Sequence, residues 1–383
     1  MFKRGLWGTV LVLLLSSSVL AASIPTFSIP VMLEDTPIGA HDWTPDATVD
    51  PQGTIHSVWA DERYGDGDGL AIMHAFSNDH GDSWSENNLV AHTPEAFLGD
   101  PRIINTCGYI LVLWTDHTNG GMYTAFSEDG GLTWNNPVTV SSEGGAYSNL
   151  VKVRKSRAVA VWSEDTGIFV ARSQDGGRSW KRPRLVVEDP SAMAPSAAFK
   201  KGLLHLAWVA ETSEGKNGIF YAYSDNLGRT WSPKEQVNQE TEANLIWGTS
   251  IAVGKVRGFG KNPQVFVGWH DDRTGDLEPY VGWRNEGSWE NMVIETNPET
   301  RDGIPELTIS RRILFSTWTN NEFSEEAYLR ISALGRRKWE TTVHVGQLGE
   351  RQKTLIVGNN IVVVFSEYTS NGKMIFSSRA SVE

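Results

Sequence analysis

The feature of this sequence that most constrains its fold is a short polar turn motif that occurs four times. In each copy, serine is followed by aspartate or asparagine, glycine, a hydroxyl residue and tryptophan: SNDHGDSW (77–84), SEDGGLTW (127–134), SQDGGRSW (173–180) and SDNLGRTW (224–231). The leading serines lie 50, 46 and 51 residues apart. A period near fifty residues is typical of a repeat architecture, in which one supersecondary unit recurs along the chain.

Upstream of each turn, an apolar stretch ends in tryptophan and is followed, usually two residues later, by a polar side chain. Seven copies of this stretch are present, with phenylalanine in the last: Trp59, Trp114, Trp162, Trp208, Trp269, Trp318 and Phe365. Each unit has room for about four strands, and no helical periodicity is present. The pattern therefore predicts an all-β fold, a β-propeller of seven four-stranded blades, with six blades as the alternative. The segment TFSIPVML (26–33) has no unit of its own, and we expect it to close the ring by pairing with the last blade.

We interpret the turn motif as structural. Serine, aspartate and asparagine side chains bond backbone N–H groups within a turn, glycine permits unusual backbone angles, and tryptophan covers the turn. A catalytic group is needed once, whereas this motif recurs in four good copies and in two degraded ones that end at Trp289 and Trp339. The residues to which we assign this role are Ser77, Asp79, Gly81, Trp84, Ser127, Asp129, Gly131, Trp134, Ser173, Asp175, Gly177, Trp180, Ser224, Asn226, Gly228 and Trp231.

Composition argues against several functional classes. A formal net charge of −12, with acidic and basic residues interspersed, disfavours a nucleic-acid-binding protein. The single cysteine, Cys107, excludes an internal disulfide, and the absence of HExxH or paired-cysteine patterns predicts no metal and no cofactor.

The first 22 residues are typical of a cleavable secretory signal peptide. Lys3 and Arg4 precede a short apolar run, and small residues up to Ala21 suit a cleavage site before Ala22. That run is shorter than the roughly 20 apolar residues of a membrane span. We therefore expect a secreted or periplasmic monomer without a membrane span, with one propeller domain over residues 24–383.

The repeated pattern S-x-D-x-G-x-[ST]-W resembles the Asp-box, or bacterial neuraminidase repeat, of the sialidase superfamily. The resemblance extends through nearly all of the chain after the signal peptide. It implies a propeller whose Asp-boxes lie on the face opposite the active site. The same repeat occurs in propellers that are not enzymes, so the resemblance indicates the fold more strongly than the reaction.

The sialidase chemistry that this resemblance implies is only partly present. Such enzymes clamp a substrate carboxylate with three arginines and use a tyrosine nucleophile beside a glutamate, with an aspartate as acid/base. The first arginine belongs to an R-I-P motif, but the matching stretch HDWTPDATVD has none, and RDGIPEL at Arg301 contains two extra residues. The loop ADERYGDGDG resembles the sialidase loop that carries a second substrate-binding arginine and the acid/base aspartate. The stretch HDDRTGDLEP repeats this pattern in the fifth unit. The repetition favours a structural role, in which the arginine forms an ion pair with a nearby carboxylate. The candidate catalytic residues are Asp68, Tyr368 and Glu367.

The acidic residues after the tryptophans occupy one equivalent position and should ring the face opposite the turns. They are Asp61, Asp116, Glu164, Asp271 and Glu367, with Glu211 one place late. We interpret them as acceptors for N–H groups of the adjoining loops. Attraction of a cation or a basic ligand is the alternative.

On the same face we expect arginines and aromatic residues to converge on a ligand site. The expected binding residues are Arg63, Asp66, Arg102, Arg273, Asp276, Arg301 and Arg351, joined by Asp68, Tyr147, Trp247 and Tyr368. The favoured function is a non-catalytic or degenerate module that binds a glycan or an extracytoplasmic protein. The alternatives are a retaining, sialidase-type exo-glycoside hydrolase acting on sialylated or related acidic glycans, and a structural propeller without a small ligand.

Overall fold

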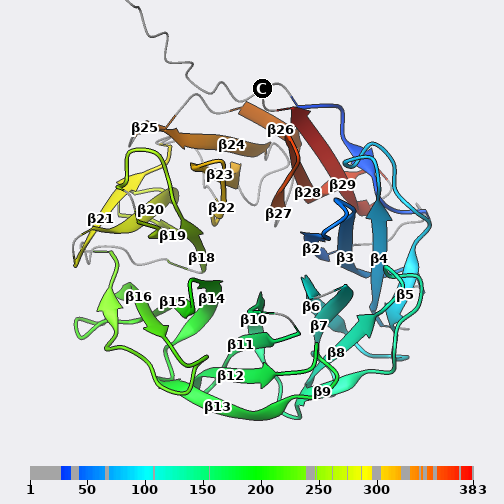
Figure 1. Cartoon of the computed structure of the whole chain (residues 1–383), viewed down its shortest axis with the longest axis horizontal. Coiled ribbons are helices and arrows are strands. Elements are labelled where there is room, and N and C mark those ends of the chain that lie inside the picture. The colour runs from blue at the N-terminus through cyan, green and yellow to red at the C-terminus, as the bar shows by residue number, and fades with distance from the viewer. Residues whose placement is uncertain are drawn as a thin grey trace, which may run out of the picture.

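The computed structural model arranges seven β-sheets as blades around a common axis (Figure 1). It describes residues 27–35, 43–64, 69–106, 108–154, 156–238, 246, 248–260, 262–273, 275–285, 287–295, 303–320, 328–335, 338–339, 343–347, 352–370 and 372–381. All regular elements within these residues are strands, and neighbouring strands of each blade are antiparallel. The predicted all-β propeller with seven blades is confirmed.

The strands follow one another outward from the axis in each blade. Blade 1 contains β2 (Trp43–Val49), β3 (Ile55–Asp61), β4 (Ala71–Ser77) and β5 (Asn88–Ala91). Blade 2 contains β6 (Leu98–Thr106), β7 (Tyr109–Asp116), β8 (Met122–Ser127) and β9 (Val138–Ser141). Blade 3 contains β10 (Ala146–Lys152), β11 (Ala158–Glu164), β12 (Gly167–Ser173) and β13 (Lys181–Glu188). Blade 4 contains β14 (Met193–Lys200), β15 (Leu203–Glu211), β16 (Asn217–Ser224) and β17 (Glu235–Gln236).

The last three blades follow the same order with two variations. Blade 5 contains β18 (Thr249–Gly254), β19 (Gln264–Asp271), β20 (Glu278–Asn285) and β21 (Ser288–Val293). Blade 6 contains β22 (Glu306–Ser310), β23 (Ile313–Asn320) and β24 (Tyr328–Gly335), and its outer position is shared by β25 (Lys338–Trp339) and β26 (Val343–Gln347). Blade 7 contains β27 (Gln352–Val357), β28 (Asn360–Thr369) and β29 (Gly372–Ser381), with β1 (Val31–Met32) as its outer strand.

The tryptophans of the second strands are buried between the blades. Six of them, from Trp59 to Trp318, are no more than 2% exposed. The apolar clusters join neighbouring blades; Trp208 of blade 4, for example, belongs to one cluster with Val159 and Val161 of blade 3. A buried aromatic side chain removes about 150–250 Å² from water, which corresponds to roughly 4 to 6 kcal/mol. Burial of these side chains between blades is therefore a major source of the stability of the ring.

The N-terminal segment closes the ring, as the sequence predicts. Val31 and Met32 of β1 pair with Ser377 and Phe376 of β29. Two further backbone bonds extend the pairing: the N–H of Ser28 donates to the carbonyl of Arg379 (2.7 Å), and that of Leu33 donates to the carbonyl of Ile375 (2.9 Å). Leu33 is buried in the apolar cluster between blades 7 and 1. Blade 7 is thus completed by residues from both ends of the chain.

The antiparallel strand order gives the propeller two different faces. We call the side with the four serine-headed turns, which join third strands to outer strands, the turn face. The opposite side carries the ends of the second strands and the starts of the inner strands, and we call it the loop face. The acidic residues that follow the tryptophans, such as Asp61 and Asp271, therefore lie on the loop face.

The first three serine-headed turns are held by the same hydrogen bonds, and the fourth differs in that the Asn226 amide donates to the Thr230 hydroxyl. In the second copy, the Ser127 hydroxyl donates to the Asp129 carboxylate (2.7 Å) and accepts the N–H of Gly131 (2.7 Å). The Asp129 carboxylate also accepts the N–H of Thr133 (2.9 Å) and its hydroxyl (2.5 Å). These bonds from Thr133 are the main reason that the pKa of Asp129 is lowered to about 2.

Turn residues also contact the preceding blade. A Cβ added to Gly131 would lie 2.0 Å from the ring of His74 in blade 1, and one added to Gly177 would lie 2.2 Å from Leu111 in blade 2. The Trp180 indole donates to the Thr124 hydroxyl of blade 2 (2.9 Å). Glycine is therefore required at these positions for close approach as well as for positive φ.

Candidate functional site

A belt of polar side chains occupies one level of the inner strands around the axis. Each member lies on an inner strand and pairs with the second-strand residue that comes directly before the buried tryptophan. In blade 7, Phe365 takes the place of that tryptophan. In blade order the members are Asp46, Arg102, Asn149, Ser196, Ser250, Glu306 and Lys353. We call these seven residues the polar belt; its four charged members belong to the adjacent blades 6, 7, 1 and 2.

Members of the polar belt bond to the next inner strand. The Asp46 carboxylate accepts the N–H of Ile103 (2.9 Å), and Nε of Arg102 donates to the carbonyl of Ser148 (2.8 Å). Nζ of Lys353 lies 2.7 Å from the Glu306 carboxylate and 3.8 Å from that of Asp46. Burial disfavours the charge on Lys353, but the two carboxylates outweigh burial and raise the pKa of its ammonium group. The belt thus presents fixed charges of alternating sign.

The inner strands of blades 1 to 4 share an unusual backbone conformation at the loop face. Thr44, Asp100, Tyr147 and Ala194 have φ values of 52°, 51°, 52° and 49°. Each lies within a register shift between the inner strand and the second strand. A non-glycine residue with left-handed backbone angles costs about 1–3 kcal/mol of conformational strain. Bulges of this kind often redirect side chains at functional sites. Four equivalent bulges therefore shape the loop face next to the polar belt.

Exposed aromatic side chains are concentrated on the loop face. Among the described residues, five aromatic side chains are strongly exposed, each by 40% to 45%: Trp43, Tyr64, Phe97, Tyr147 and Tyr368. Trp43 and Tyr147 open the inner strands β2 and β10, while Tyr64 and Tyr368 lie at or just after second-strand ends. The exposed aliphatic residues, such as Leu89 and Leu185, lie on outer strands or on the turn face instead. The loop face therefore presents flat, amphipathic rings to solvent.

Two of these rings enclose a lysine at the junction of blades 7 and 1. Nζ of Lys373 lies 5.1 Å from the Trp43 ring centre and 5.2 Å from that of Tyr368. Lys373 is only 2% exposed and is the cross-strand partner of Tyr368. An ammonium group between two aromatic rings is stabilised by their negative faces, so this contact orients Trp43 and Tyr368.

Glu367 differs from the other acidic residues of its class. In blades 1, 3 and 5 the tryptophan indole donates to the acid two residues later: Trp59 to Asp61 (2.9 Å), Trp162 to Glu164 (2.6 Å) and Trp269 to Asp271 (2.8 Å). Blade 7 has Phe365 in place of tryptophan, and Oε2 of Glu367 is buried without a hydrogen-bond partner in the described structure. Burial raises the pKa of Glu367 to about 7. A carboxyl group of this pKa can donate or accept a proton near neutral pH.

The arginines of the two similar loops make ion pairs within their own blades. Arg63 bonds Asp61 through Nε (2.9 Å) and Nη2 (2.8 Å), and it also contacts Asp35 and Asn87. Arg273 bonds Asp271 through Nε (2.8 Å), and its guanidinium group lies 4.4 Å from the Tyr280 ring centre. Each arginine thus pairs with the acid at the end of its own second strand, and Arg63 also ties its loop to Asp35 and Asn87. This is the kind of structural ion pair that the sequence favoured.

Other predicted positions are only partly described. Arg102 belongs to the polar belt, Tyr147 to the exposed aromatics, and Asp276 is partly buried on the fifth-blade loop. The Asp116 carboxylate accepts N–H groups of Thr118 (3.0 Å) and Asn119 (2.8 Å) of its loop. The positions predicted from the sequence that lie outside the described part are Asp66, Asp68, Trp247, Arg301 and Arg351, together with the segment predicted to be a signal peptide.

Tyr368 and Glu367 do not form a compact pair. They are successive residues of β28, and side chains of successive strand residues point to opposite faces of the sheet. A nucleophilic tyrosine activated by a neighbouring glutamate requires the two groups to approach each other. Their catalytic assignment stays a prediction.

Several residues of this face were missed from the sequence, including Asp46, Glu306 and Lys353. A signal for two of them was present, because Asp46 and Glu306 each follow a proline near the start of an inner strand, as Arg102 and Ser196 do. The stretches TPD, DPR, APS and IPE thus mark the polar belt in four of the seven blades. Lys353 has no such proline.

No group of three or more residues suited to hold a metal is found in the described part of the chain. Nor does that part contain a helix long and apolar enough to span a membrane.

Comparison with known proteins supports the fold. No family model and no curated protein matches the chain. Among solved structures, a polysaccharide lyase, an ulvan lyase, superposes with a TM-score of 0.61 and 11% identity, covering 92% of this chain and 94% of that chain. A protein of unknown function from Dyadobacter fermentans gives 0.59 and 14%, covering 92% and 98%. The phage phi92 endosialidase gives 0.53 and 9%, covering 94% and 70%. At these identities the likeness establishes the fold alone.

Proposed function

We propose that this protein is an exported, sialidase-like Asp-box propeller that binds a glycan on its loop face without hydrolysing it. The observation that carries the proposal is the concentration of the five exposed aromatic side chains on that face. Aromatic rings pack against the apolar faces of sugar rings, while nearby polar groups fix orientation. Arg102, Lys353 and the two carboxylates beside Lys353 supply such groups at the polar belt.

The backbone supports the same assignment. Trp43 precedes left-handed Thr44, and Tyr147 is itself left-handed, so strained backbone holds two of the exposed rings at the starts of inner strands. Arg102 lies in the inner strand between them. A ligand spanning blades 1 to 3 would meet two rings and one guanidinium group.

The test is glycan-array screening of the secreted protein, followed by calorimetric titration of the best oligosaccharide. Tyr147→Ala and Trp43→Ala should each weaken binding about tenfold or more, because loss of a stacked ring removes about 1.4 kcal/mol or more. Leu185→Ala is the control, since Leu185 is also exposed but lies on outer strand β13. Unchanged affinity in both aromatic variants would refute this assignment, as would a wild type that binds no glycan.

The second candidate is a sialidase-type exo-glycoside hydrolase, and the observation that favours it is Glu367. Its partly buried carboxyl group, with a pKa raised to about 7 by burial, suits a general acid or base. A fluorogenic sialoside assayed with wild type, Glu367→Gln and Tyr368→Phe decides between the two functions. Turnover by the wild type that both substitutions abolish would establish the enzyme, and no turnover by the wild type would eliminate it.

A further inference from the structure

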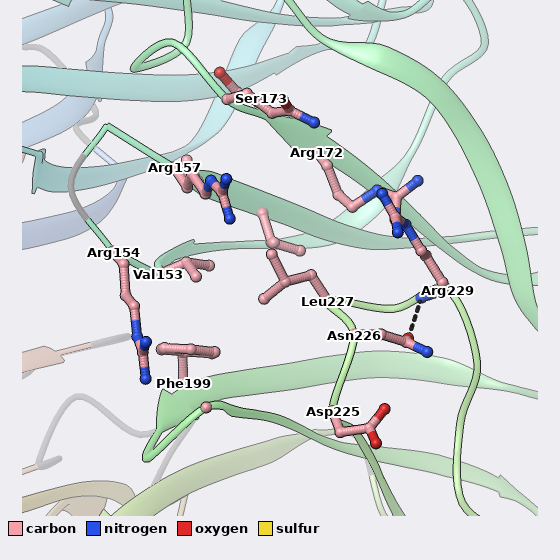
Figure 2. Close-up of a pocket in the computed structure, with 14 residues that line it drawn as sticks. Val153, Arg154, Arg157, Arg172, Ser173, Phe199, Asp225, Asn226, Leu227 and Arg229 are labelled. Atoms are coloured by element: carbon pink, nitrogen blue, oxygen red, sulfur yellow. Dashed lines mark hydrogen bonds between the residues drawn. The ribbon is translucent and has the colours of Figure 1, made fainter.

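A cavity of about 390 Å³ opens on the turn face between blades 3 and 4 (Figure 2). One side is formed by Val153, Arg154, Arg157, Ala158 and Val159, which lie between or at the facing ends of β10 and β11, and by the end of β12. The other side is formed by the hairpin at Phe199 and Gly202 and by the serine-headed turn of blade 4. It lies on the opposite side of the ring from the polar belt and the exposed aromatic residues.

Four arginines line this cavity: Arg154, Arg157, Arg172 and Arg229. In Figure 2, the guanidinium groups of Arg172 and Arg229 lie close together on one side, and Arg157 extends into the space from the other. No guanidinium group of the four makes an ion pair or a hydrogen bond with any described residue. The one acidic residue of the lining, Asp225, makes no ion pair with them and points away in Figure 2. The cavity is therefore basic in a chain whose net charge is −12.

Comparison of two consecutive turns explains why Arg229 is unpaired. Arg178 and Arg229 occupy the same position in the turns of blades 3 and 4. Arg178 forms an ion pair with Glu128, the second residue of the preceding turn, and stacks on Tyr109 and Phe126. The residue equivalent to Glu128 in the next turn is Gln174, which is uncharged and lines the cavity. Replacement of one carboxylate by an amide thus leaves Arg229 available to a ligand.

Positive charges that lie close together without a counter-ion repel one another, and this repulsion affects the pKa of Arg172. Burial lowers the pKa of its guanidinium group, and the charges of Arg229 and Arg184 lower it further. An anion placed among these groups would remove the repulsion. Guanidinium groups pair with carboxylate and sulfate oxygens in a fixed planar geometry.

Apolar side chains form another part of the lining, beside polar residues such as Ser173, Gln174 and Asn226. Val153, Val159 and Leu227 form part of the wall, and the centre of the Phe199 ring lies 5.9 Å from the Arg154 guanidinium carbon. A bare inorganic anion would use the arginines but leave these side chains without contact. The volume lies near the lower end of the range for small-molecule sites, so the cavity suits an anionic group carried on a body of about the size of a sugar ring.

We infer that this cavity is a second ligand site, specific for an acidic sugar that bears a sulfate or carboxylate group. Arg172 and Arg229 bind the anionic group, and Phe199 and Leu227 pack against the sugar ring. The site is independent of the loop face, so the turn face of blades 3 and 4 is itself a binding surface. Binding weakens as ionic strength rises, because the charges are partly exposed.

The experiment measures binding of a sulfated disaccharide, glucuronic acid, inorganic sulfate and neutral glucose to the full-length secreted protein by calorimetric titration. The sulfated disaccharide should bind more tightly than inorganic sulfate, and glucose should not bind. Arg172→Gln combined with Arg229→Gln should weaken binding by at least about tenfold. These substitutions relieve like-charge repulsion, so the variant should fold and its melting temperature should not fall.

Two further variants make the test specific. Gln174→Glu places a carboxylate where Glu128 stands in the preceding turn, so it should pair with Arg229 and weaken binding without removing an arginine. Arg178→Gln removes a charge from the equivalent turn position outside the cavity and should change affinity less than about twofold. The inference is overturned if neither acidic sugar binds, if inorganic sulfate binds as tightly as the sulfated disaccharide, or if the double arginine variant binds like wild type.

Discussion

Replacing Gly131 by alanine should destabilise the ring through a clash between neighbouring blades. Gly131 has a φ of 92°, and an added Cβ would lie 2.0 Å from Cε1 of His74. His74 is fully buried, and its Nε2 lies 3.1 Å from Nδ1 of His56, so the ring has little room to move. A left-handed alanine costs about 1–2 kcal/mol, and overpacking of a buried site adds about 1–3 kcal/mol. We therefore expect the free energy of unfolding to fall by about 2–5 kcal/mol.

The preceding glycine provides the matched control. Gly130 also has a positive φ, 78°, but no atom lies within 4 Å of a Cβ added there. Gly130→Ala should therefore show the backbone contribution alone, about 1–2 kcal/mol. Scanning calorimetry measures the difference in melting temperature between the two variants. Because unfolding entropy scales with chain length, each kcal/mol of destabilisation should lower the melting temperature of this chain by about 1 °C. Equal shifts in the two variants would refute the idea that the turn glycine is needed for contact between blades.

Three further perturbations test other parts of the structure. Leu33→Ala should lower the free energy of unfolding, measured by urea denaturation, by about 2–5 kcal/mol, because Leu33 is buried beside the closing strand. Met32→Ala is the control and should have little effect, because Met32 is 37% exposed. Asp129→Ala should cost about 1–3 kcal/mol at neutral pH and leave glycan affinity unchanged. The pKa of Asp129 is lowered from 3.8 to about 2 on folding, so the contribution of its ionised form is complete above about pH 4. The difference from wild type should therefore shrink as the pH falls toward 2. The pKa of Glu367 is raised from 4.5 to about 7, so the folded state loses stability as the pH rises from about 4.5 to about 7. Glu367→Gln should therefore raise the melting temperature at pH 8 but not at pH 4, and an equal shift at both pH values would contradict this.

The fold could be predicted from the sequence because its strongest signals are local. The tryptophans of six second strands are buried between blades, and the serine-headed turns are held by bonds within eight residues, so both recur visibly along the chain. The closing strand was identified by elimination, since the segment around Val31 had no unit of its own and the last blade lacked an outer strand.

The polar belt was less accessible to this reasoning. Lys353 is placed between Glu306 and Asp46 only because the ring closes, and Asp46 lies some three hundred residues away in the chain. No local pattern brings those residues together. The replacement of tryptophan by Phe365 was visible in the sequence, but its effect on Glu367 required knowledge that the indole normally donates to that carboxylate.

The cavity of the turn face depends on a relation between two repeats. Arg178 and Arg229 look equivalent in the sequence, and what separates them is the residue that each meets on the preceding blade. Aligning each turn with the one before it, rather than each copy with a consensus, would have revealed the missing carboxylate at Gln174.

The closing strand also determines how the ring responds to mechanical force. Because β1 and β29 are antiparallel, Ser28 lies beside Arg379, and the start of one strand is next to the end of the other. Tension applied between these two strand ends acts on one backbone hydrogen bond at a time, as in opening a zipper, rather than on all of them in shear. The ring should therefore open under low force at this seam, while the blades, whose strands are joined by hairpins, stay intact.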